Sequence, residues 1–401
     1  MCSKVLLRFM KLPRRLSDIC VLAFVSTGFS ACGGQDGGIS GERTEENVQR
    51  LNVEAKRGVV ASELFGRPTL IHGVAGDSDL VFVTEAVAGR VAVHDRWSGR
   101  EVALLPPPPG GWVLPFQMRI VEEGRLVVLD AGGFPGAPTI PRVYDYDYRF
   151  DRETWAFSAT LVRSVRFEGL PVIFSEDVEV LLDGTYVVSD VVLGALWLIL
   201  QDGTVVPGLF PESFDRPIPE LTSCLYSGPP LSVDGIPFSV GGFAPGVGSL
   251  TNDGTYLYYG NGCVGGVHRI PLASLFDTSR SAYDRAADEE LVSAPAPGDF
   301  DVVKGLAFNR SNAHDRRLYA VEPFKLRVLR IDLTSGAREV LAQDPVLFDF
   351  PVTSAFLPSP PGAQTLVVAS DQEHRFSGIN QAITTDMFQL PFLVTRVLVT
   401  N

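Results

Sequence analysis

The chain has 401 residues, of which 34 are basic and 47 acidic, and its formal net charge is −13. Such an acidic surface repels phosphate groups, so nucleic acid is excluded as a partner. About 350 residues follow the N-terminal region, and a single core of that length usually divides into domains unless the fold is built from repeats. The length therefore favours an architecture built from repeats.

Residues 1–31 have the pattern of a secretory signal peptide. Five basic residues and no acid lie within residues 1–15, and an apolar run follows from Ile19 to Phe29. This run is about half as long as the roughly 20 residues that a membrane-spanning helix needs. A basic start, a short apolar stretch and small residues before Cys32 predict cleavage during export. A short buried core helix is the alternative interpretation.

The segment around Cys32 resembles a lipobox, the motif cleaved before a cysteine that receives a diacylglycerol. It reads Phe29-Ser30-Ala31-Cys32-Gly33-Gly34. The resemblance implies that Cys32 is the lipidated N-terminus and the contact with the membrane, where acyl chains contribute about 0.8 kcal/mol per CH2. Gly33 after the lipid cysteine implies sorting to the outer membrane. Residues 32–57 are predicted to form a flexible tether, because their Gly-rich polar start cannot bury a core.

Two cysteines would remain in the exported domain. Cys2 and Cys20 lie in the predicted signal peptide, and Cys32 is the predicted lipid site. Cys224 and Cys263 are then an even pair in an oxidising compartment, and we predict a disulfide between them. Two buried thiols are the alternative. A metal pair is disfavoured because no Cys-x-x-Cys spacing or histidine cluster accompanies these cysteines.

One strand pattern recurs six times after the tether. An apolar strand ends in an acid or another polar residue, and in most units a glycine-rich turn and a further strand follow. The six strands are Leu80–Glu85, Leu126–Asp130, Tyr186–Asp190, Tyr256–Asn261, Leu318–Glu322 and Leu366–Asp371. Their β-branched and aromatic content is typical of strands, and Asp-Gly turns such as Asp183-Gly184 indicate hairpins. Six units predict an all-β fold over residues 58–401, a six-bladed β-propeller of four-stranded antiparallel blades.

Two segments complete this prediction. Ser279–Val292 contains good helix formers and is expected to form a short helical excursion from the fourth blade. Val59–Phe65 is an unassigned strand before the first unit, and Phe392–Val399 is an apolar strand at the end of the last unit. Because an unclosed blade would expose a strand edge, we predict that the first of these strands completes the last blade.

The acids that end the repeated strands suggest a catalytic ring, but their regularity favours a structural role. They are Glu85, Asp130, Asp190, Glu322 and Asp371. A residue that recurs in nearly every blade usually accepts backbone N–H bonds in a turn. The five histidines show no His-x-x-x-His spacing, so zinc hydrolysis has no support.

The repeats resemble two related families of six-bladed propellers, the gluconolactonase and senescence-marker family and the Yellow and major royal jelly family. The resemblance covers about residues 60–400. Its clearest passages are Leu250–Tyr259 with Val267–Leu275, and Gly124–Gly132 with Pro141–Asp145. Catalytic members hold a divalent cation with a Glu, two Asn and an Asp at the starts of the innermost strands, and a hard cation such as calcium prefers such oxygen ligands.

The corresponding positions here predict an axial pocket with a different character. Its residues are His72, Gln117, Glu176, Asp177, Lys304 and Thr353. Lys304 replaces the family's last Asp and His72 replaces its Glu, so calcium is disfavoured because an ammonium repels a cation. Only Gln117, Glu176 and Asp177 are left as candidate metal ligands. We expect Lys304 to pair with Glu176 or Asp177, because a buried unpaired acid is costly.

These residues leave three hypotheses for function. The first is a non-catalytic propeller at the cell envelope that binds a small molecule or an envelope protein. The second is a lactonase or esterase carried by analogy of fold, in which His72 and Asp177 are the candidate catalytic residues. The third is a binder of small amines, with Glu176 and Asp177 as counter-charges.

Overall fold

The computed structural model of the protein describes residues 54–55, 58–133, 140–213, 215–295, 300, 302–309, 315–359 and 363–400. The predicted signal peptide, Cys32 and the predicted tether up to residue 53 lie outside the described residues. Glu54–Ala55, at the end of the predicted tether, form the short strand β1. No helix among the described residues has the length and apolar character needed to cross a membrane.

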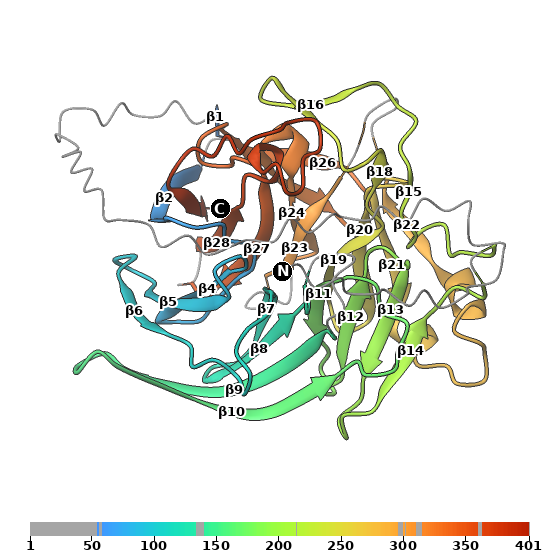
Figure 1. The fold of residues 1–401 in the computed structure, drawn as a ribbon, viewed down its shortest axis with the longest axis horizontal. Helices are drawn as coiled ribbons and strands as arrows, with labels where there is room; N and C mark the ends of the chain where they lie inside the picture. The colour runs from blue at the N-terminus through green and yellow to red at the C-terminus, as the bar shows by residue number, and fades with distance from the viewer. Residues whose placement is uncertain are drawn as a thin grey trace, which may run out of the picture. The chain divides into compact units, whose positions relative to one another are not determined.

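Six antiparallel sheets form the blades (Figure 1), and in blades 1 to 4 the four strands follow chain order from the axis outward. Blade 1 contains β3 (Val74–Gly76), β4 (Leu80–Glu85), β5 (Arg90–Asp95) and β6 (Glu101–Leu104). Blade 2 contains β7 (Pro115–Glu122), β8 (Arg125–Asp130), β9 (Arg142–Asp151) and β10 (Ala156–Arg166). Blade 3 contains β11 (Ser175–Val180), β12 (Tyr186–Asp190), β13 (Ala195–Ile199) and β14 (Val205–Leu209).

Blade 4 repeats this order, whereas a strand from the beginning of the described chain forms the outer edge of blades 5 and 6. Blade 4 contains β19 (Val247–Asn252), β20 (Tyr256–Asn261), β21 (Val267–Pro271) and β22 (Glu290–Ser293). Blade 5 contains β23 (Lys304–Phe308), β24 (Arg317–Glu322), β25 (Arg327–Asp332) and β26 (Arg338–Gln343), with β1 paired to β26 as an extra outer strand. Blade 6 contains β27 (Pro351–Leu357), β28 (Ala363–Ser370), β29 (Phe392–Thr400) and β2 (Val59–Arg67). The predicted six-bladed propeller is confirmed.

The innermost strands form a closed ring. Each contacts the innermost strands of its two neighbouring blades, in the order β3, β7, β11, β19, β23, β27 and back to β3. Blade 6 joins the two ends of the described chain, because β2 pairs along its length with β29, from Val59 opposite Val399 to Arg67 opposite Phe392. This pairing confirms the predicted closure and protects the outer edge of β29.

Packing between blades explains the strand sequences. β12 and β13 are buried at every residue, whereas the outermost strand β10 alternates between exposed and partly buried residues. Inner strands need apolar side chains on both faces because a neighbouring blade covers each face. The core beside the closure contains Ile71, Val74 and Phe392. Full burial of such a side chain contributes about 1.5–3 kcal/mol.

Helical structure is scarce in the described residues. The excursion of blade 4 begins with α1 (Leu272–Leu275), earlier than predicted, and continues with η2 (Asp284–Asp288), a single 3-10 turn. Residues 290–292 belong to β22, because they pair with β21 at the blade's outer edge. Two further 3-10 turns are η3 (Pro323–Lys325) and η4 (Glu373–Arg375).

Two small two-stranded sheets are inserted between blades 3 and 4. β15 (Cys224–Leu225) pairs with β18 (Phe243–Ala244), and β16 (Leu231–Val233) pairs with β17 (Ile236–Phe238). A disulfide links Cys224 in β15 to Cys263 after β20, with their Cα atoms 5.6 Å apart. The predicted pairing is confirmed, and it ties the insertion to blade 4.

Candidate ligand site at the axial end of the blades

Lys304 is the central cation of a buried charged cluster. It is the first residue of β23, and its Nζ lies 3.0 Å from Oε1 of Glu176 on β11 and 3.7 Å from Oε1 of Glu373. The three side chains are only 11%, 9% and 12% exposed. Lys304 therefore points inward and pairs with Glu176, one of the two acids expected from the sequence.

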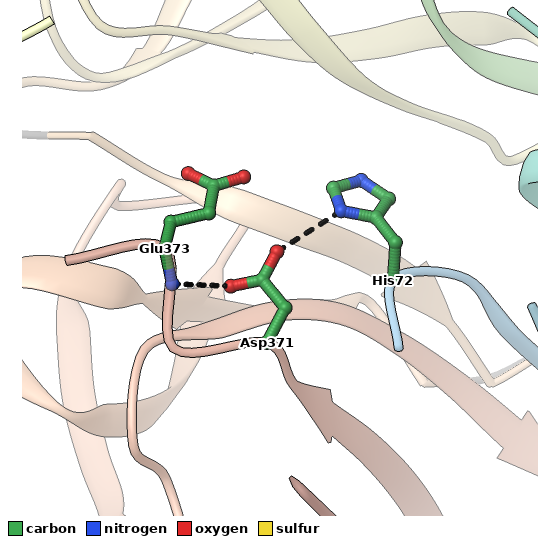
Figure 2. Close-up of side chains that lie close together, drawn as sticks. All are labelled: His72, Asp371 and Glu373. Atoms are coloured by element: carbon green, nitrogen blue, oxygen red, sulfur yellow. Dashed lines mark hydrogen bonds and ion pairs between the residues drawn. The ribbon is translucent and has the colours of Figure 1, made fainter. Parts of the chain in front are cut away.

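His72 extends the cluster toward blade 6 (Figure 2). Its ring stacks on Phe116 with centroids 3.6 Å apart, and its Nδ1 lies 3.1 Å from Oδ2 of Asp371. The other oxygen of Asp371 accepts the backbone N–H of Glu373 at 3.1 Å. Ligand-type atoms of His72, Asp371 and Glu373 all lie within 4.8 Å of one another. The cluster thus holds three acids, one lysine and one imidazole.

Burial shifts the proton affinities within the cluster. It lowers the pKa of His72 to about 4, and the positive charge of Lys304 lowers it further. Burial raises the pKa of Asp371 to about 7, against the opposing effect of Lys304. Burial and the neighbouring Asp371 raise the pKa of Glu373 to about 7. Burial alone would lower the pKa of Lys304, but attraction to Glu176, Glu373 and Asp371 outweighs it and raises that pKa. His72 is therefore neutral and Lys304 charged at neutral pH.

The amide of Gln117 bonds within the protein. Its Nε2 donates to Oγ1 of Thr353 at 3.0 Å, and its Oε1 accepts the backbone N–H of Met118 at 3.0 Å. The bond between Gln117 on β7 and Thr353 on β27 brings together two of the predicted pocket residues. Gly73 allows the close approach, because a Cβ there would lie 2.8 Å from Oε1 of Gln117.

Asp177 lies in a separate network. Its Oδ2 accepts a bond from Arg119 at 2.9 Å and the backbone N–H of Leu250 at 2.7 Å, while its Oδ1 accepts the N–H of Val178 at 2.7 Å. Arg119 also donates to Glu179 at 3.0 Å. The structure therefore does not bring Asp177 to Lys304, and Asp177 links blades 2, 3 and 4 through the guanidinium of Arg119.

The repeated acids divide into three kinds. Asp130 and Asp190 accept several backbone N–H groups of the adjoining loops, as predicted for structural caps. Glu85 and Glu322 instead pair with arginines. Asp371 combines a cap contact with its contact to His72, so only this member of the series belongs to the cluster.

The segment that carries Glu373 is fastened to the insertion between blades 3 and 4. Arg375 pairs with Asp349 at 3.1 Å and with Asp234 of the β16–β17 turn at 3.0 Å. Asn380 is fully buried; its Nδ2 donates to the carbonyl of Pro237 at 2.7 Å, and its Oδ1 accepts the N–H of Ser239 at 3.0 Å. These bonds fix the position of η4 and hence of Glu373.

Sequence patterns did not identify Glu373, Arg119 or the second contact of Asp371. Glu373 stands two residues beyond the repeated acid, in a segment with no counterpart in the other blades. Arg119 is in the innermost strand of blade 2, where the pattern predicts buried apolar or small polar residues. The only sequence signal was the unusual polarity of these positions.

A calcium ring of the gluconolactonase type does not fit these residues. The ammonium of Lys304 occupies one ring position, and Asp177 and Gln117 already have protein partners. Calcium needs six to eight oxygen ligands, so such a ring would lack donors here.

Comparisons with known proteins support the fold. No protein-family profile matches the chain, and no curated protein matches it. A protein of unknown function from Bacteroides thetaiotaomicron is 11% identical with a TM-score of 0.52, over 85% of this chain and 76% of that one. The major allergen Mala s 1 of Malassezia sympodialis is 10% identical with a TM-score of 0.51, over 86% and 96%.

The solved structures similar to this chain also include a gluconolactonase from Xanthomonas campestris. It is 12% identical with a TM-score of 0.49, over 86% of this chain and 90% of that one. The six-bladed propeller implied by the sequence resemblance is confirmed by the strand order of the structure itself. At these identities the likeness concerns the fold alone.

Proposed function

We propose that this protein is an exported, lipid-anchored propeller that binds a small cation at its axial cluster without turning it over. The observation that carries the proposal is the charge imbalance of the buried cluster. Three carboxylates, those of Glu176, Asp371 and Glu373, surround the single ammonium of Lys304. Burial raises the pKa of Asp371 and of Glu373 to about 7, because ionised carboxylates are costly to bury. A bound cation would stabilise the ionised forms.

The packing around the cluster favours binding over catalysis. Lys304 is held by Glu176, and the ring of His72 is held by Phe116 and Asp371. Burial lowers the pKa of His72 to about 4, which makes it a weak general base at neutral pH. Fixed, paired groups suit recognition of a charged ligand, because they are already in place before it arrives.

Titration calorimetry of the purified chain tests this proposal. The probes are putrescine, choline and Zn2+, each with wild type and the Glu373→Gln variant. We expect at least one probe to bind wild type with a stoichiometry of one per chain. The same probe should bind the variant at least ten-fold more weakly. If no probe binds, the proposal is wrong. Steady hydrolysis of a lactone or ester panel that Glu373→Gln abolishes would also contradict it.

One contact favours the hydrolase alternative. Asp371 holds Nδ1 of His72 at 3.1 Å, an arrangement that orients an imidazole for proton transfer through its other nitrogen. The same substrate panel decides this alternative, because a His72→Gln variant should then lose all turnover while it remains folded.

Attachment to the envelope is a separate part of the proposal. It is supported by the basic start, the apolar run and the lipobox-like residues that end at Cys32. Mass spectrometry of the N-terminal peptide should find a diacylglyceryl group on Cys32, and membrane fractionation should place the protein with the outer membrane. A Cys32→Ser variant that remains lipidated or equally membrane-bound would contradict the anchor.

A further inference from the structure

We propose that His72, Asp371 and Glu373 bind a divalent first-row transition-metal cation. The inference rests on the proposed function and deepens it, because it names the cation that the axial cluster takes. The ligand set is distinct from a ring of innermost-strand oxygens. Two of its three members, Asp371 and Glu373, come from the segment after β28.

The spacing of the donor atoms suits one shared ion. Nδ1 of His72 and Oδ2 of Asp371 are 3.1 Å apart. Two ligands that each lie about 2.1 Å from one ion, at roughly a right angle, are about 3 Å apart. Figure 2 shows the imidazole of His72 and the carboxylate of Glu373 on the same side of Asp371. All three donors lie within 4.8 Å of one another, so the proposed ion requires the carboxylate of Glu373 to move toward the other two donors.

His72 is prepared for coordination. Its side chain is 4% exposed, and stacking on Phe116 fixes the plane of the ring. Nδ1 is the ring nitrogen that faces Asp371.

The charges of the cluster balance when a divalent ion is added. Lys304 and Glu176 cancel each other at 3.0 Å. A Cβ at Gly248 would lie 3.0 Å from Oε1 of Glu176, so this glycine leaves room for the carboxylate that faces Lys304. Asp371 and Glu373 then remain as two buried carboxyl groups, and one divalent cation would neutralise both when they bind it as carboxylates. The repulsion from Lys304 is offset because its partner Glu176 stays beside it.

The donor types select the class of ion. One imidazole nitrogen with two carboxylates suits zinc, cobalt, manganese or iron in the divalent state. Calcium prefers six to eight oxygens, and three donors with one nitrogen do not meet that preference. Lys304 and Glu373 are the most exposed members of the cluster, at 11% and 12% of their side chains, so the ion enters beside them.

Metal titration of the full chain tests the inference. The protein is first treated with a chelator and then titrated with Zn2+ by calorimetry and with Co2+ by visible absorption. We expect one ion per chain and Co2+ bands characteristic of mixed nitrogen and oxygen ligands. Asp371→Asn and Glu373→Gln should each weaken Zn2+ binding at least ten-fold, and the double variant should abolish it.

The matched control is Asp190→Asn. Asp190 ends the corresponding strand of blade 3 and is equally buried, but it contacts only backbone N–H groups. Its variant should bind Zn2+ like wild type. Circular dichroism during heating verifies that each variant is folded. If Asp371→Asn fails to fold, the isosteric Glu373→Gln variant alone tests the metal site.

Three outcomes overturn the inference. They are no binding of either ion to wild type, equal binding by wild type and both site variants, and equal weakening by Asp190→Asn. If putrescine or choline binds while Zn2+ and Co2+ do not, the metal inference fails and the proposed function stands. If none of the four probes binds, both fail.

Discussion

The ammonium of Lys304 and the carboxylate of Glu176 meet at 3.0 Å, although 128 residues separate them along the chain. They come from the innermost strands of blades 5 and 3, β23 and β11. Both side chains are almost completely buried. Pairs of this kind contribute little net stability while intact, but the removal of one partner leaves an uncompensated charge in a dry environment.

Lys304→Met is therefore expected to lower the free energy of unfolding by about 3–5 kcal/mol, the cost of a broken buried ion pair. Urea unfolding followed by circular dichroism measures the change. The double variant Lys304→Met/Glu176→Gln is the control, and it should recover most of the loss because it removes both charges. A single variant as stable as wild type would show that the pair is not buried as described.

Asn380→Ala should loosen the segment that carries Glu373. The amide of Asn380 makes four hydrogen bonds, to Pro237 and His374 through Nδ2 and to the N–H groups of Ser239 and Ala382 through Oδ1. Because some of these partners would remain buried without a bond, we expect a loss of about 2–4 kcal/mol.

Hydrogen exchange measures where the effect of Asn380→Ala falls. Exchange should accelerate in residues 231–240 and 372–382, while β12 and β13 exchange as in wild type. Exposed Gln381→Ala is the neighbouring control, since its backbone N–H, which donates to Ser239, is retained. Uniform acceleration throughout the chain would mean that the segment is not an independent unit.

The disulfide should stabilise the propeller through its closed loop. Cys224 and Cys263 are 39 residues apart in sequence, and loop closure of that length corresponds to about 4 kcal/mol in the chain-entropy account. A Cys224→Ala/Cys263→Ala variant should therefore unfold at a lower urea concentration. Reduction of wild type should shift its midpoint toward that of the variant and leave the variant unchanged. Reactive thiols at Cys224 and Cys263 in unreduced wild type would contradict the pairing.

The free energy of unfolding should depend on pH through His268, and this contribution can be measured separately. Burial lowers its pKa, but the hydrogen bond to Glu289 at 2.7 Å, the charge of Glu289, the carbonyl of Gly265 and the charge of Glu220 outweigh burial and raise the pKa above 6.5. A raised histidine pKa stabilises the folded state fully below pH 6.5, and this contribution is lost as the pH rises through the folded-state value.

The measurement compares wild type with His268→Gln. The stability difference between them should be largest below pH 6.5 and should shrink as the pH increases above it, because only protonated His268 forms the ion pair with Glu289. Subtraction of the two curves cancels the other titrating groups. A difference that grows with pH would have the wrong sign for this pairing.

Much of the fold was predictable because its signals are local. The run Tyr186–Asp190 was predicted as a strand from its β-branched and aromatic residues, and it forms β12 with the same bounds. The Asp-Gly turn before it requires a left-handed residue, which Gly184 supplies with a φ of +83°. By contrast, the segment Ser279–Val292, which is rich in helix formers, contains only a short 3-10 helix. Its residues 290–292 pair with β21 and therefore belong to a strand.

The site was less predictable. The sequence placed Lys304 and Glu176 at the axial end through a resemblance, and their contact is present. It also placed Asp177 there, but Arg119 on the neighbouring blade binds that carboxylate. Asp371 looked like one more turn cap in a regular series, and only its contact with His72 distinguishes it.

The strands and their grouping into six units follow from the sequence, because alternation, turns and repeat spacing act over a few residues. The closing strand and the cysteine pair were predicted by elimination, since each was the partner left over. The tertiary structure alone decided which charges meet. His72 and Asp371 are 299 residues apart and touch only because the ring closes between blades 1 and 6. Glu373 reaches Lys304 only because a segment without repeat counterparts is fastened to a distant insertion. Contacts of that kind depend on the geometry of the closed ring, which no local pattern records.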